Sequence, residues 1–169
     1  MALPKYLHGR EGASGKDSTL VLGVGNTLQC DDGLGIRVAE MLANRKLPVG
    51  VEVREAGTPG IGLVNEWQGW KRVMIIDATQ MGETPGAWKQ FNPQEVKLIA
   101  EGGSYSLHEP GVAQALQLAE AIDLLPEEVI IYGVEPERVE WGEELSAPVK
   151  NALPGLVDKI YNDLWKREE

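Results

Sequence analysis

The chain has 169 residues, of which 43% are hydrophobic, and it carries a formal net charge of −10 at pH 7. This length predicts one domain with a sizeable core, and the charge argues against nucleic acid or an anionic membrane surface as a partner. The single cysteine, Cys30, excludes an intramolecular disulfide, and no apolar run is long enough for a membrane span or a signal peptide. We therefore expect a cytoplasmic protein whose partners are basic surfaces or metal cations.

In chain order, residues 1–18 are predicted to be a flexible N-terminal tail and residues 19–169 a single domain, because glycines and charges without hydrophobic periodicity fill the tail. Beyond it, apolar runs typical of buried strands alternate with segments of helical periodicity. Strands are expected at 20–22, 49–56, 72–78, 87–91 and 128–134, with another short one near 96–99. Helices are expected from residue 34, at 61–70, at 112–124 and at 146–167, the last interrupted near Pro154.

This alternation predicts a single three-layer α/β/α domain with a mainly parallel, twisted sheet. Right-handed crossovers place the loops that follow the parallel strands at one edge of such a sheet. Ligands bind at that edge in open α/β sheets. Chemistry-bearing residues in these loops are therefore the candidates for a site.

The first of these loops lies in the stretch LVLGVGNTLQCDDGLG, residues 20–35, which joins a strand, a tight turn and a helix start. It does not match a dinucleotide fingerprint, because Leu28 stands where the third glycine is required. Asp31 and Asp32 would also repel a phosphate at the helix start. Asp31 alone is explained equally well as the N-cap of the following helix, but two adjacent acids are more than a cap needs.

Three residues in this alternation could share one crevice. Asp32 follows the first strand, Asp77 ends the third long strand, and His108 lies in a Gly- and Ser-rich loop before a helix. Two carboxylates and one imidazole suit a transition metal with positions left open for water or substrate. No HExxH motif or Cys/His cluster is present, so such a site would be assembled from distant segments and hold metal weakly. The structural alternative is that Asp77 caps a neighbouring helix and His108 is an ordinary loop residue.

A second alternative uses Cys30 as a nucleophile, with His108 as its base and an aspartate orienting the imidazole. No thiol-hydrolase signature surrounds Cys30. Its acidic neighbours disfavour the thiolate, so an inert thiol is the better interpretation.

Four segments, GVGNTLQCDDGLG at 23–35, IIDATQMGETPG at 75–86, SLHEPG at 106–111 and IIYGVEPE at 130–137, stand in the order and spacing of one known family. Over residues 20–164 the chain resembles the maturation endopeptidases of nickel–iron hydrogenases. The resemblance implies an aspartic-type endopeptidase activity that removes a short C-terminal extension from the precursor of the hydrogenase large subunit after nickel insertion. It implies that Asp32, Asp77 and His108 are both the catalytic and the nickel-contacting residues.

The resemblance further implies that the nickel is supplied by the precursor and that no organic cofactor is tightly bound. Some members carry Glu where this chain has Asp32, which is one methylene shorter. We expect a monomer, with residues 57–60 and the acidic loop 135–144 bordering the crevice. A metal-activated water and a carboxylate base both remain open as the hydrolytic agent. A nickel-sensing chaperone that holds the precursor without cutting it is the non-enzymatic alternative.

Overall fold

The computed structural model describes residues 18–102, 106–107 and 110–166. The predicted tail therefore lies outside the described residues, except for Ser18 at its end. The Ser18 side chain is buried, and its hydroxyl accepts a hydrogen bond from the backbone N–H of Lys71 at 3.3 Å. This contact ties the start of the first strand to the residue that precedes the central strand.

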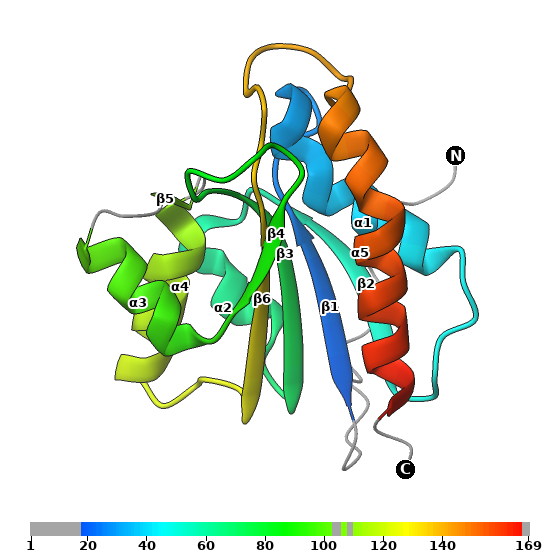
Figure 1. The fold of residues 1–169 in the computed structure, drawn as a ribbon. Helices are drawn as coiled ribbons and strands as arrows, with labels where there is room; N and C mark the ends of the chain where they lie inside the picture. The colour runs from blue at the N-terminus through cyan, green and yellow to red at the C-terminus, as the bar shows by residue number, and fades with distance from the viewer. Residues whose placement is uncertain (1–17, 103–105, 108–109, 167–169) are drawn as a thin grey trace, which may run out of the picture.

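The sheet has the strand order β2-β1-β3-β6-β4 (Figure 1). Its parallel members are β1 (Thr19–Val24), β2 (Val51–Gly57), β3 (Arg72–Gln80) and β6 (Glu128–Val134). The edge strand β4 (Trp88–Phe91) runs antiparallel to β6, and the two-residue β5 (Ser106–Leu107) pairs antiparallel with the end of β3. The expectation of a mainly parallel sheet is confirmed.

Helices cover both faces of this sheet, which confirms the three-layer prediction (Figure 1). One face carries α1 (Leu34–Ala43) and α5 (Ala147–Trp165), and the other carries α2 (Leu63–Glu66), α3 (Pro93–Gly102) and α4 (Pro110–Ala121). Two short 3-10 helices, η2 (Cys30–Gly33) and η3 (Gly60–Gly62), lie in the loops that follow β1 and β2. Both loops belong to the edge where sequence analysis places the site.

The central strand β3 explains why both faces are apolar. Val73 and Ile75 belong to the core beneath α2, α3 and α4, whereas Met74 and Ile76 belong to the core beneath α1 and α5. Successive side chains of a strand point to opposite faces. Asp77 therefore shares the face of Val73 and Ile75, on the α4 side of the sheet.

The strand predicted near 96–99 is wrong, because these residues form part of α3. Val96 and Ile99 are both buried and three positions apart, which is one face of a helix. A capping box starts this helix: Asn92 Oδ1 accepts from the Glu95 N–H, and Glu95 Oε2 accepts from the Asn92 N–H, both at 2.8 Å. The reciprocal pair satisfies two backbone donors and selects helix over strand.

Two predicted helices also have different bounds. The helix expected at 61–70 is reduced to η3 and the four residues of α2. The interruption expected at Pro154 does not occur, because α5 is continuous for 19 residues. Its buried stripe, which includes Leu153 and Leu156, supplies more packing than the backbone hydrogen bond that proline removes.

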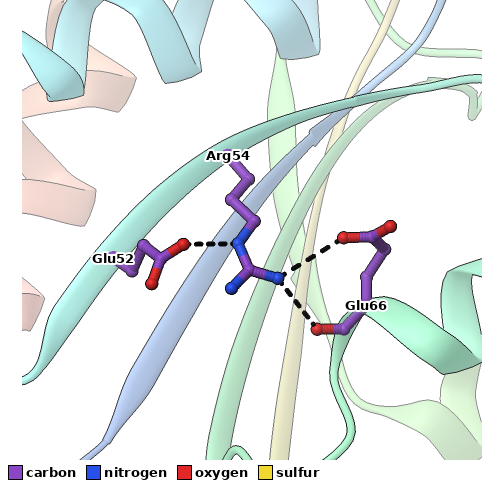
Figure 2. Close-up of polar contacts among 3 residues, drawn as sticks. All are labelled: Glu52, Arg54 and Glu66. Carbon is purple, nitrogen blue, oxygen red and sulfur yellow. Dashed lines mark hydrogen bonds and ion pairs between the residues drawn. The ribbon is translucent and has the colours of Figure 1, made fainter. Parts of the chain in front are cut away.

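Arg54 links the edge strand β2 to α2 (Figure 2). Its Nε donates to Glu52 at 2.5 Å, and its Nη1 donates to the backbone carbonyl and the carboxylate of Glu66 at 3.3 and 3.4 Å. The guanidinium also lies 5.6 Å from the ring centroid of Trp70. The pairs are partly exposed and contribute little energy individually. Together they bind the strand and the helix that flank the loop at 58–62.

Candidate active site

The start of α1 lies directly on β1 and β3, at the point where the pairing of these two parallel strands ends. A Cβ atom added to Gly35 would stand 2.3 Å from the carbonyl oxygens of both Val24 and Ile76. Only a residue without a side chain permits this approach. The loop from β1 to α1 is thereby held over the end of β1 and the adjoining part of β3.

The same loop folds back on itself at Gly25, whose φ of 135° is open to glycine and strained for other residues. A Cβ atom there would stand 1.9 Å from the carbonyl oxygen of Asp32. The Asp32 carboxylate is fully buried, and its Oδ2 accepts a hydrogen bond from the Asn26 N–H at 2.9 Å. Residues 25–32 thus form a compact turn in which the Asn26 N–H orients the Asp32 side chain.

Asp77 is fully buried in β3, at the first residue beyond the part of the strand that pairs with β1. The prediction that it ends the strand is wrong, because β3 continues to Gln80 and pairs there with β5. Asp77 is paired in register with Gly133 of β6 and directly follows Ile76, whose carbonyl is approached by Gly35. The η2 segment that contains Asp32 contacts β3. The structure therefore brings Asp32 and Asp77 to one edge of the sheet.

His108 lies outside the described residues, but the chain on either side of it is described. Leu107 in β5 pairs with Thr79, two residues beyond Asp77. The next described residue after the gap, Pro110, begins α4. Among the described residues there is no group of three His, Cys, Asp or Glu side chains that could hold a metal ion. The three-ligand set therefore stays a prediction that depends on His108.

Asp31 has a different role from its neighbour. Its Oδ2 accepts from the N–H groups of Glu137 and Arg138 at 2.9 and 3.1 Å and from the Ser146 hydroxyl at 2.7 Å, while its Oδ1 accepts from the Ser146 N–H at 2.7 Å. The N-cap position of α1 is Gly33, which provides no side-chain cap. The N-cap explanation for Asp31 is wrong. Asp31 instead anchors the loop between β6 and α5.

Cys30 is a free thiol that is only 4% exposed. Its N–H donates to the Gly142 carbonyl at 2.7 Å, and a Cβ atom on Gly142 would stand 2.8 Å from its Sγ. The sulfur is therefore covered by the 135–144 loop. This geometry supports the inert thiol over the nucleophile.

The acidic loop 135–144 borders the site, as expected, but part of it is buried. The Glu135 side chain is buried, and its Oε2 accepts from the N–H groups of Met81 and Glu83 at 2.5 and 3.3 Å. This contact joins the turn after β3 to the end of β6. Sequence reasoning missed this role, and the partnership of Asn26 with Asp32, because neither has a local signal in the sequence.

A family model described as hydrogenase maturation protease, HycI, matches residues 36–163. The chain is 37% identical over 136 residues to the hydrogenase expression/formation protein HoxM of Azotobacter vinelandii, covering 79% of this chain and 66% of that protein. The hydrogenase maturating endopeptidase HybD of Escherichia coli superposes with a TM-score of 0.78 at 28% identity, covering 89% of this chain and 93% of that one. The chain belongs to the hydrogenase maturation protease family.

The match to the family extends over most of the fold described above. The HybD hydrogenase maturation protease of Thermococcus kodakarensis has a TM-score of 0.72 at 29% identity, over 86% of this chain and 97% of that one. The chain spans about two thirds of the length of HoxM from Azotobacter vinelandii. Among its described residues, no helix of this hydrogenase maturation protease is both long and apolar enough to cross a membrane.

Proposed function

We propose that this chain is the endopeptidase that removes a short C-terminal extension from the nickel-loaded precursor of a nickel–iron hydrogenase large subunit. The observation that carries the proposal is the pair of fully buried carboxylates, Asp32 and Asp77, held at one sheet edge in a member of this family. The nickel is part of the substrate in this proposal. It is not a resident cofactor of the enzyme.

The residues at the edge have chemistry that suits this task. Carboxylate oxygens and an imidazole nitrogen are ligands that nickel accepts. In the proposal, Asp32, Asp77 and His108 contact the ion that the precursor carries and so register the scissile segment against the enzyme. The Asn26 N–H limits the freedom of the Asp32 carboxylate, which reduces the entropy lost when a substrate is bound.

Hydrolysis adds one water across the peptide bond, and a base must accept a proton as that water attacks. We assign the role of this base to one of the two carboxylates, Asp32 or Asp77. The amine of the released extension takes up a proton when the bond breaks. The buried thiol of Cys30 takes no part in this scheme.

The deciding experiment incubates the purified chain with nickel-loaded precursor and measures the mass of the product. A loss equal to a C-terminal peptide is expected, and nickel-free precursor should be cut far more slowly. An unchanged mass in a stable complex would identify a chaperone. Equal cleavage of both precursors would remove nickel from the proposal. The Asp77→Asn variant is the matched control for a contaminating protease.

We further propose that the enzyme works as a cytoplasmic monomer. The net charge of −10 supports repulsion between copies of the chain at neutral pH. Sedimentation of the isolated protein tests the oligomeric state, and fractionation of cells tests the compartment. A stable dimer, or recovery outside the cytoplasm, would contradict the corresponding part.

A further inference from the structure

A large aromatic side chain is exposed beside the candidate active site. Trp141, in the loop between β6 and α5, is 79% exposed, and Leu28, in the loop between β1 and α1, is 48% exposed. The Gly142 N–H donates to the Leu28 carbonyl at 2.9 Å, and Gln29 forms a parallel bridge with Gly142. Leu28 and Trp141 therefore lie on adjoining backbone segments, and we call this pair the Trp141 patch.

The backbone beneath the Trp141 patch is held by several hydrogen bonds. Asp31 accepts from the N–H groups of Glu137 and Arg138, and its own N–H donates to the Arg138 carbonyl at 3.2 Å. The Cys30 N–H donates to the carbonyl of Gly142, the residue that follows Trp141. In Figure 1 the loop between β6 and α5 arches over the top of the molecule beside the start of α1. A tryptophan on such a platform can bind a partner with little loss of conformational entropy.

The charges around the Trp141 patch indicate what kind of surface complements it. The loop carries one exposed cation, Arg138, and an excess of exposed anions, Glu137, Glu140, Glu143 and Glu144. Aromatic side chains surrounded by polar residues are typical hot spots of protein interfaces. The complementary partner is a protein surface with an apolar hollow rimmed by lysine and arginine.

We infer that the Trp141 patch is the docking surface for the folded body of the precursor, as distinct from its C-terminal extension. The inference rests on the proposed function. The position of the patch next to the candidate active site supports this inference. Leu28 lies in the loop between β1 and α1, between Asn26 and Asp32, and the Asn26 N–H donates to the Asp32 carboxylate. A partner anchored on Trp141 therefore lies against the segment that the extension must reach.

The test compares the steady-state kinetics of precursor processing by the wild type, Trp141→Ala and Trp141→Phe. The alanine variant should raise KM for the precursor by about tenfold or more while kcat stays within about twofold. The phenylalanine variant should recover much of the loss. Val49→Ala is the matched control, because Val49 is 95% exposed but precedes β2 at the opposite edge of the sheet. It should leave KM unchanged.

Several outcomes separate this inference from the proposed function. If the wild type cuts the precursor and Trp141→Ala cuts it with the same KM, the docking surface is overturned and the proposed function is not. A dimer of the wild type that Trp141→Ala dissociates would make a second copy of this chain the occupant, which also overturns it. A wild-type chain that holds the precursor through Trp141 without cutting it would support the docking surface and overturn the protease. A wild type that neither binds nor cuts the precursor overturns both.

Discussion

The Asp31 carboxylate accepts hydrogen bonds from both the backbone N–H and the hydroxyl of Ser146, each at 2.7 Å, across 115 residues of sequence. Ser146 occupies the N-cap position of α5, yet its side chain makes no cap hydrogen bond. Its hydroxyl is used to join α5 to the loop that follows β1. This single contact ties the first and last thirds of the chain together beside the candidate active site.

Asp31→Ala should therefore lower the free energy of unfolding by about 4 kcal/mol, because four buried or partly buried donors lose their acceptor. Ser146→Ala removes one donor only and should cost about 2 kcal/mol. Urea unfolding of both single variants and of the double variant measures their coupling. Additive losses would show that the two residues act independently.

Gly35→Ala should be among the most damaging small substitutions in the chain. The added methyl group would overlap the carbonyl oxygens of Val24 and Ile76, so the start of α1 must move away from the sheet at a cost of about 3 kcal/mol. Gly155→Ala is the control, because that position lies within α5 and has no atom within 4 Å of the added Cβ. The control should gain about 0.5 to 1 kcal/mol. Equal thermal stability of the two variants would contradict the close approach.

Cys30→Ala should leave processing of the precursor close to the wild-type rate, and thiol alkylation of the folded protein should not inhibit it. The reason is that the sulfur is buried under Gly142. Initial rates before and after treatment with iodoacetamide make the measurement. A folded Cys30→Ala variant without activity would restore the thiol mechanism.

The variants Asp32→Asn, Asp77→Asn and His108→Ala should each abolish or greatly slow processing. If these residues contact one ion carried by the precursor, their effects are strongly non-additive, and the Asp32/Asp77 double variant is hardly worse than either single one. The asparagine variants preserve side-chain volume, so thermal unfolding should remain cooperative and serves as the control. Losses that multiply in the double variant would show that the carboxylates act independently.

Acid should weaken one contact far from the candidate active site. Burial alone would raise the pKa of Asp163, but the hydrogen bond and charge of Lys159, the Tyr132 hydroxyl and the charge of Lys166 together lower it below the ordinary 3.8. A carboxylate with a lowered pKa stabilises the fold above its unfolded pKa, and this contribution is lost as the pH falls through the folded value.

The stability difference between wild type and Asp163→Asn should thus be less than about 1 kcal/mol at pH 7, since Lys159 is partly exposed. It should shrink toward zero as the pH falls below 3.8. Urea unfolding at a series of pH values measures it. A difference that grows on acidification would reverse the sign and contradict the lowered pKa.

The overall fold could be predicted from the sequence because its signals are local. Continuous apolar runs such as 73–76 indicate strands buried on both faces, and their separation by helical segments indicates a parallel sheet. The same logic placed Asp32 and Asp77 at one edge, because parallel strands end there. The prediction of a strand at 96–99 was wrong because a short apolar stretch fits both the helical and the strand periodicity. The capping box of Asn92 and Glu95 favours the helix.

What the sequence by itself determined was therefore the α/β order of the chain and the set of candidate residues. What only the tertiary structure decided was the division of labour between two adjacent and chemically identical residues. Asp31 turns to donors more than 100 residues away, whereas Asp32 turns to the N–H of Asn26 in its own loop. The two aspartates are the same residue type at adjacent positions, so the local sequence does not distinguish them. Their hydrogen-bond partners differ because the loop between β6 and α5 packs against one side of the β1–α1 loop. That packing is a property of the folded chain alone.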